Sequence, residues 1–130
     1  MIVVDTSVWV DHLRDSRTSE VAALRSVIVA QDAVVITGVI RAELLQGVSE
    51  RSVLALAREL DAFPLIPLED ADYDTAAGLF RASRSAGTTV RNVVDCMIAA
   101  PCIRLDLPLL HADVDFDRLA SVSDLRIVPT

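Results

Sequence analysis

The stretch Ile2-Val3-Val4-Asp5-Thr6-Ser7 decides the fold. Its apolar run is too short for a helix and predicts a buried strand, whose carboxyl end carries the carboxylate of Asp5. The run Ala33-Val34-Val35-Ile36-Thr37 predicts a second strand of the same kind. Continuous apolar runs are typical of strands that are covered on both faces, as in a parallel sheet.

Helical segments separate the predicted strands. We expect strands at 2–5, 33–37, 65–67, 108–111 and 126–128, and helices at 7–14, 19–31, 38–46, 50–62, 70–86, 93–105 and 114–120. This alternation predicts an α/β protein, a three-layer α/β/α sandwich around a central parallel sheet of about four to five strands. With 130 residues and 52% apolar content, the chain suits a single domain over residues 1–130.

Four acids occupy the ends of these elements. Asp5 and Asp113 follow predicted strands, Glu43 lies on the flank of an apolar helical stripe, and Asp95 falls in the first turn of a helix capped by Asn92. Each acid alone also fits a helix cap or a solvated helix residue. Parallel strands would bring all four to one edge of the sheet, however, whereas four independent caps need not converge.

Such a cluster requires protons or a cation. Two carboxylates 4 Å apart repel by about 4 kcal/mol at an effective dielectric constant of 20. Oxygen ligands suit Mg²⁺ or Mn²⁺ better than zinc, which prefers histidine and cysteine. Of the two histidines, only His111 lies near an acid of the cluster in sequence, where it could contact substrate or serve structure alone.

Several of these segments together resemble the PIN-domain ribonucleases, and within them the VapC toxins of type II toxin–antitoxin systems. The resemblance rests on residues 2–7, on Arg41-Ala42-Glu43-Leu44, on the run from Thr89 through Asp95 to Ala100, and on the segment from Leu109 to Phe116. It extends from the first predicted strand to the last helix, and the ordered combination is far more specific than the tripeptide Asp-Thr-Ser alone.

The resemblance implies the toxin of a toxin–antitoxin pair, an Mg²⁺- or Mn²⁺-dependent endoribonuclease that cleaves RNA with metal-activated water. It also implies a homodimer and an antitoxin encoded by a neighbouring gene. The family's acidic quartet falls on Asp5, Glu43, Asp95 and Asp113. Of these, Asp5, Asp95 and Asp113 are the expected metal ligands, with Asp5 and Asp95 the most direct.

Two further residues take supporting roles in this resemblance. The Thr6 hydroxyl is expected to support the metal ligands. Asp115 is either an auxiliary acid or an ordinary residue of a helix turn, and the second reading is favoured.

The charge distribution bears on RNA binding. The net charge is −7, yet all twelve basic residues are arginines, and Arg81, Arg84 and Arg91 lie in a segment, 80–94, without any acid. These arginines could hold an RNA backbone, because guanidinium groups bind phosphates in a forked geometry, or they could form a solvated helix face. With few aromatic residues, an extended base-stacking platform is not expected.

Other features set further expectations. Pro101 predicts a kink in the helix at 93–105. Cys96 and Cys102 would be about 9 Å apart along that helix, beyond disulfide reach, and should be buried thiols. Helices 7–14 and 50–62, beside Trp9, could form a groove for an apolar antitoxin segment. No segment has the pattern of a membrane span or a signal peptide, so we expect a cytoplasmic protein.

Other functions fit the sequence less well. A haloacid-dehalogenase-like, metal-dependent phosphatase needs a second aspartate two residues after the first, where this chain has Ser7. A phosphoacceptor receiver domain needs a lysine, and the chain contains none. A catalytically weak or inactive PIN-like module that acts through protein binding remains a second alternative.

Overall fold

A four-stranded parallel sheet lies at the centre of the computed structural model, which describes residues 1–130. Its strands are β1 (Ile2–Val4), β2 (Val34–Thr37), β3 (Leu65–Ile66) and β4 (Leu109–Leu110), in the spatial order β3-β2-β1-β4. In the register, Val3 pairs with both Val35 and Leu109. The predicted parallel sheet is confirmed, and β1 lies in its middle.

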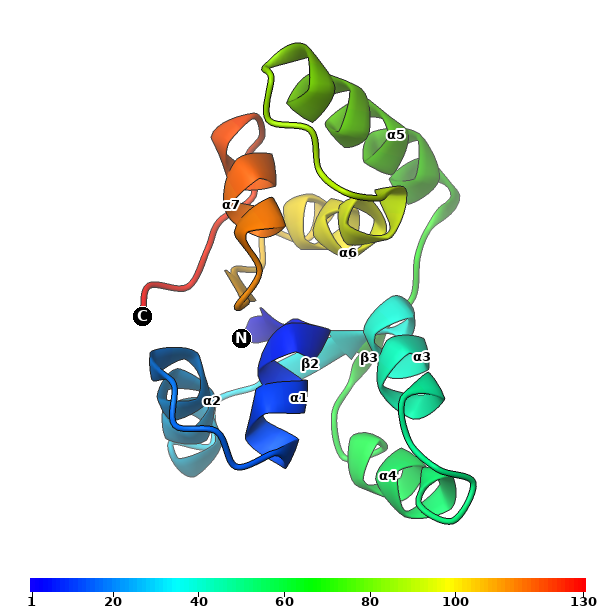
Figure 1. The fold of residues 1–130 in the computed structure, drawn as a ribbon, viewed down its shortest axis with the longest axis vertical. Coiled ribbons are helices and arrows are strands. Elements are labelled where there is room, and N and C mark those ends of the chain that lie inside the picture. Colours follow the sequence, from blue (N-terminus) through cyan, green and yellow to red (C-terminus); the bar gives the residue numbers. More distant parts are fainter.

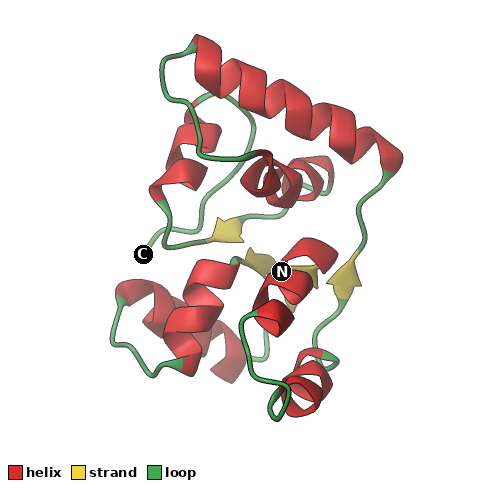
Figure 2. Cartoon of the chain, turned by 45° about the vertical axis from the view of Figure 1, so that its right-hand side comes forward, coloured by secondary structure: helices red, strands yellow, loops and turns green.

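Helices cover both faces of the sheet. They are α1 (Thr6–Leu13), α2 (Ser19–Val29), α3 (Gly38–Gln46), α4 (Val53–Leu60), α5 (Asp70–Ser85), α6 (Val93–Arg104) and α7 (Val114–Ser121). In Figure 1, α5, α6 and α7 lie above the sheet, and α1 to α4 lie below it. The turned view in Figure 2 shows the same three layers, so the α/β/α sandwich is confirmed.

The predicted fifth strand at 126–128 is wrong. The segment makes one isolated parallel bridge, between Leu109 and Ile127, in which the Leu109 amide donates to the Arg126 carbonyl and the Leu109 carbonyl accepts from the Val128 amide, both at 2.9 Å. Because β4 itself is only two residues long, it offers a single residue for pairing, and the C-terminal segment cannot extend the ladder. The other elements agree with the prediction to within a few residues at their ends.

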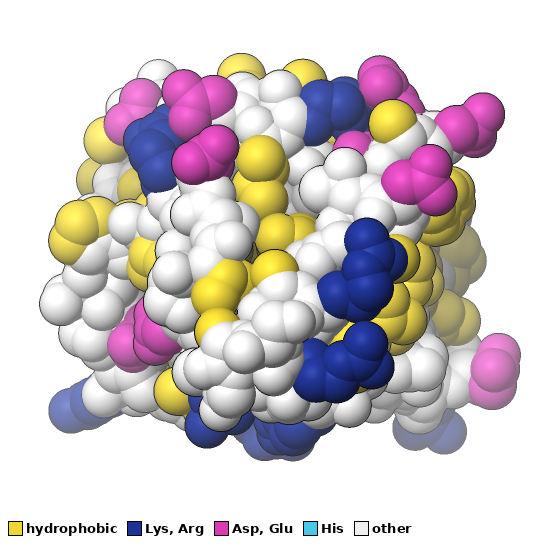
Figure 3. All heavy atoms as spheres, turned by 90° about the horizontal axis from the view of Figure 1, so that it is seen from above, with side chains coloured by type: hydrophobic (Ala, Val, Ile, Leu, Met, Phe, Trp, Pro, Cys, Tyr) yellow, Lys and Arg dark blue, Asp and Glu magenta, His cyan; other side chains and the backbone are white.

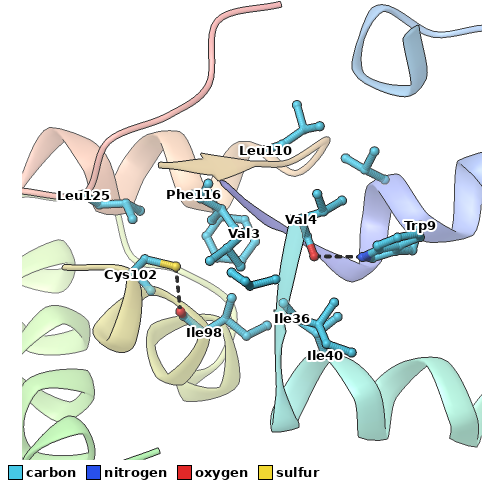
Figure 4. Close-up of a cluster of buried hydrophobic side chains, with 14 of the residues drawn as sticks. Val3, Val4, Trp9, Ile36, Ile40, Ile98, Cys102, Leu110, Phe116 and Leu125 are labelled. Carbon is cyan, nitrogen blue, oxygen red and sulfur yellow. Dashed lines mark hydrogen bonds between the residues drawn. The ribbon is translucent and has the colours of Figure 1, made fainter. Parts of the chain in front are cut away.

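The hydrophobic core joins the sheet to both helical layers. Figure 4 shows Val3, Val4 and Ile36 of the sheet packed between Ile98 of α6 and Ile40 of α3. The indole Nε1 of Trp9 donates to the Val4 carbonyl at 3.1 Å, which ties α1 to the central strand. This packing holds the carboxyl end of β1, and therefore Asp5, in a fixed position.

Helix α6 tolerates its proline. It continues without interruption through the buried Pro101 to Arg104, and the residue before its first turn, Asn92, caps it with its side chain. Cys96 and Cys102 are buried free thiols, as predicted. Because Pro101 lies more than a turn after Asp95, its missing amide hydrogen does not affect the turn that carries this acid.

No helix of the structure combines the length and the apolar composition that crossing a bilayer requires.

Candidate metal-dependent active site

Asp5 lies where β1 ends and α1 begins, and it is only 4% exposed. Its Oδ2 accepts hydrogen bonds from the Ser7 amide at 3.0 Å and from the Ser7 hydroxyl at 2.6 Å. Burial raises the pKa of Asp5, although the bonds from Ser7 oppose this shift. The capping role that the sequence allowed is therefore real, and it holds the carboxylate at the edge of the sheet.

Glu43 reaches the same edge from α3. Its Oε1 accepts a hydrogen bond from the Thr6 hydroxyl at 2.8 Å, while no protein group donates to Oε2. Burial, together with the charge of Asp5, raises the pKa of Glu43. Thr6 thus holds one oxygen of Glu43, and the expected role of its hydroxyl in supporting the metal ligands stays a prediction.

Asp95 lies in the first turn of α6, whose N-cap is Asn92. No protein group donates a hydrogen bond to its carboxylate. Burial and the charges of Asp113, Asp5, Asp115 and Glu43 raise the pKa of Asp95 to about 7. The four predicted acids therefore act on one another electrostatically, and the repulsion is strongest at Asp95.

Asp113 is the N-cap of α7 and differs from Asp95 in being fully bonded. Its Oδ1 accepts from the Asp115 amide at 3.0 Å, and its Oδ2 forms an ion pair with the Arg91 guanidinium. Arg91 comes from the loop between α5 and α6, so this pair joins two segments that are distant in sequence. The guanidinium of Arg91 therefore already supplies a positive charge beside Asp113.

Asp115 is completely buried, which is unusual for an acid of a first helical turn. Arg91 donates to its Oδ2 through Nε at 2.9 Å and through the backbone amide at 3.2 Å, while Arg118 donates to Oδ1 at 2.8 Å. Burial tends to raise the pKa of Asp115, but these hydrogen bonds outweigh it and lower the pKa. Asp115 is thus a buried counter-ion rather than an ordinary residue of a helix turn.

His111 lies inside the turn before α7, with its side chain 7% exposed. Its Nδ1 accepts from the Asp113 amide at 3.0 Å, Nε2 lies 3.0 Å from a carboxylate oxygen of Asp117, and the ring packs against Phe116. These contacts use both ring nitrogens. They favour the structural role for His111, since both nitrogens are engaged within the protein.

The predicted basic residues divide into two kinds. Arg91 is bound to the acids, whereas Arg81 and Arg84, on the last turns of α5, are exposed and form no ion pair. Arg81 and Arg91 line one hollow, and Arg84 does not. The segment from 80 to 94 is therefore not a uniform basic face.

The donor set fits a hard divalent cation. Oxygen atoms of Asp95, Asp113 and Asp115 lie within 4.8 Å of one another. Asp115 is a poor ligand because it is completely buried and each of its oxygens is bonded to an arginine, whereas the side chain of Asp113 is 23% exposed and only one of its oxygens is bonded to an arginine. Asp95 is the opposite case, a partly buried carboxylate without donors among like charges, and it requires a proton or a cation. The structure thus provides an all-oxygen cluster of the kind that magnesium-like ions prefer.

Sequence reasoning missed two residues of the site. The Ser7 hydroxyl bonds Asp5 and also accepts from the Ala112 amide at 3.0 Å, which links the carboxyl end of β1 to the loop before Asp113. Arg118 fixes Asp115 from the following turn of α7. The spacing Asp115-Arg118, three residues apart on a helix, is the signal that could have indicated the second contact.

The acidic cluster at the edge of a parallel α/β/α sheet is consistent with a PIN-type protein, and a family model described as the PIN domain matches residues 2–122. This match covers most of the chain. A VapC ribonuclease of Mycobacterium bovis and ribonuclease VapC11 of Mycobacterium tuberculosis are each 35% identical over 129 residues, 97% of this chain and 96% of the relative. The chain therefore belongs to the PIN-domain family and, within it, to the VapC ribonucleases.

A solved structure agrees with this fold. The VapBC-5 structure from Mycobacterium tuberculosis, described as a member of the VapBC family of toxin–antitoxin systems, has a TM-score of 0.71 and 24% identity. The alignment covers 99% of this chain and 98% of that one. At this identity, the likeness concerns the fold.

Proposed function

We propose that this protein is the toxin of a toxin–antitoxin pair and an Mg²⁺- or Mn²⁺-dependent endoribonuclease. Residues 1–130 act as a single PIN domain, since one buried cluster of apolar side chains runs through all three layers. The main support is Asp95, a carboxylate without hydrogen-bond donors whose pKa is raised to about 7 by burial and by four other acids. The relatives named ribonucleases support the activity.

Asp5, Asp95 and Asp113 would hold the metal ion. When bound, a divalent ion supplies a Lewis acid that activates water and stabilises charge on the attacked phosphate. Ser7 holds Asp5 in place, and Arg91 holds Asp113, so two of the three carboxylates are oriented before any ion arrives. Preorganised ligands lower the free-energy cost of binding.

Glu43 is the residue that we expect to accept a proton from the attacking water. Thr6 bonds one of its oxygens and leaves Oε2 free, and the raised pKa of Glu43 makes it a better base than an exposed glutamate. The buried, fully bonded Asp115 has neither property. It therefore serves Arg91 rather than the reaction itself.

Water as nucleophile determines the end groups of the products. Cleavage should leave a 5′-phosphate and a 3′-hydroxyl, whereas a histidine-driven ribonuclease would use the RNA 2′-hydroxyl and leave a 2′,3′-cyclic phosphate without metal. The test is to incubate the purified protein with total RNA and Mn²⁺ or Mg²⁺ and to read the end groups by ligation and phosphatase sensitivity. Cyclic-phosphate ends that persist in EDTA would contradict the proposal.

An antitoxin is the proposed partner. A largely apolar pocket of about 370 Å³ lies where the sequence predicted a groove, between α1 and α4, lined by Trp9, Leu13, Leu56, Leu60 and Phe63 among others. It would take the apolar face of an antitoxin segment. Trp9 packs edge-on against Phe63 with ring centroids 5.1 Å apart, so its indole forms one wall of this pocket.

A homodimer and a cytoplasmic location complete the proposal. The exposed apolar side chains of Leu54 and Leu65, on α4 and on the edge strand β3, provide surface for a second copy. Light scattering on the purified protein tests the dimer. The location follows from the proposed RNA substrate, and fractionation of the producing cells tests it.

A further inference from the structure

The hollow at the junction of α5 and α6 has the composition of a nucleotide site. It is a shallow, open hollow of about 400 Å³, lined by Ala77, Phe80, Arg81, Arg91, Asn92 and Val93. No acid is among these residues. Figure 3 looks down on this end of the molecule and shows arginine side chains beside apolar atoms, while acidic side chains gather elsewhere.

Two guanidinium groups line this hollow, and only Arg91 is ion-paired, with Asp113 and Asp115. Arg81 is exposed, and it forms no ion pair and no hydrogen bond with the protein. Asp113 and Asp115 already offset the charge of Arg91, so the unpaired charge that an entering anion would meet is that of Arg81. A phosphodiester group has the charge and the paired oxygens that arginine binds in a forked geometry.

Hydrogen bonds to a buried aspartate fix the position of Arg91. Its Nε and its backbone amide both donate to Oδ2 of the fully buried Asp115, whose other oxygen accepts from Arg118. The side chain of Arg91 is nevertheless 68% exposed, so part of its guanidinium stays open to solvent. Its position is therefore fixed without removing its ability to bind a phosphate.

Phe80 and Asn92 add contacts for a base. Phe80 is half-buried on α5 and offers an aromatic surface to the hollow. The side-chain oxygen of Asn92 is used by the amides of Val94 and Asp95, which leaves its two amide hydrogens without an acceptor in the protein. A single aromatic ring beside free donors suits one base. An extended base-stacking platform was not expected from the sequence either.

We infer that this hollow, formed by Phe80, Arg81, Arg91 and Asn92, is a binding subsite for a nucleotide of single-stranded RNA next to the cleaved phosphate. Arg91 belongs both to the hollow and, through Asp113, to the acidic cluster, so a nucleotide bound here has its phosphate beside the cluster. The inference rests on the proposed ribonuclease function. It adds where the strand lies and which residues position it.

Cleavage kinetics on a short single-stranded RNA in Mn²⁺ provide one test. Arg81→Ala should raise KM about tenfold with kcat within about twofold, since Arg81 forms one charge-assisted contact away from the reacting atoms. The slope of log(kcat/KM) against log salt should also become shallower by about 0.7 for the lost phosphate contact. Phe80→Leu, which keeps apolar volume, should raise KM about fivefold or more for the normal strand. It should have no effect on a strand with an abasic site at the bound position.

Two arginines serve as controls. Arg58, on α4 at the opposite side of the sheet, is exposed and unpaired like Arg81, so Arg58→Ala should behave as the wild type. Arg84→Ala should have an effect of twofold or less, because Arg84 lies near the hollow but does not line it. Equal effects of Arg81→Ala and Arg84→Ala would mean a diffuse basic surface and would overturn the subsite.

A second measurement does not depend on cleavage. Titration of the metal-free protein with a hexauridylate oligonucleotide, followed by NMR, should shift the amide signals of Phe80, Arg81 and Asn92 more than those of α4. A wild-type protein that cuts no RNA but shows these shifts would contradict the proposed function and keep the subsite. Active protein without these shifts, and with wild-type kinetics in Arg81→Ala, would overturn the subsite alone.

Discussion

The acidic edge has two halves that differ in their hydrogen bonds: Asp95 has no donor, whereas Asp115 is bonded by two arginines. On one side, Asp95 has no hydrogen-bond donor, and burial with neighbouring charges raises its pKa to about 7. On the other side, Asp115 is more deeply buried, yet Arg91 and Arg118 lower its pKa. Burial therefore does not decide the state of an acid here. The partners decide it, and the side without partners is the side that can bind a cation.

Loss of Asp95 should have the largest effect. Asp95→Asn keeps the size of the side chain but removes the unpaired charge, and cleavage of RNA in Mn²⁺ should fall by several orders of magnitude. The same variant should lose the rise in melting temperature that Mn²⁺ gives the wild type, because a ligand stabilises only the folded state that binds it. Calorimetry with and without Mn²⁺ measures this shift. Wild-type cleavage by Asp95→Asn would remove the contrast between the two halves.

The paired half should be important for stability. Asp115→Ala leaves Arg91 and Arg118 without their common acceptor and opens a hole in a fully buried position, and we expect a loss of about 2–3 kcal/mol in the free energy of unfolding. Urea unfolding measures it. The control is Asp124→Ala. Asp124 is exposed and its side chain forms no hydrogen bond, so this change should alter stability by less than about 0.5 kcal/mol. Equal values for both variants would show that the network contributes nothing.

A further expected effect is on the pH dependence of the metal-free protein. The pKa of Asp95 is about 7 in the folded state and near 3.9 in the unfolded chain, so its ionisation destabilises the fold as pH rises through this range. The melting temperature in EDTA should therefore increase as pH falls from 8 to 5. Asp5 and Glu43, whose pKa values are also raised, act in the same direction.

The scan must stay above pH 5 for a physical reason. Asp72 and Asp115 have lowered pKa values, and the stability that they contribute is lost as pH falls below about 4. In Asp95→Asn, which cannot titrate at this position, the increase between pH 8 and 5 should become smaller. A wild-type melting temperature that decreases as pH is lowered from 8 to 5 would mean that Asp95 has a partner in solution.

Much of the fold was predictable from the sequence, whereas the catalytic role of the four acids stays a prediction. The short apolar runs at the starts of β1 and β2 predicted buried parallel strands, and the positions of Asp5, Glu43, Asp95 and Asp113 relative to these elements predicted a common edge. The groove beside Trp9 also followed from two apolar helices. These features depend on local periodicity and on the rule that parallel strands end on the same side, which act within short segments.

Only the tertiary structure decided which acids have partners. Arg91 and Asp115 are 24 residues apart, and Ser7 reaches the Ala112 amide across 105 residues, so no local pattern could indicate either bond. The extent of the C-terminal pairing was decided in the same way, because a two-residue β4 leaves one position for a bridge. By itself, the sequence determined where the carboxylates would gather, since secondary structure places them. The packing of distant segments determined which of them have bonding partners, because the fold alone brings those groups within a few ångströms.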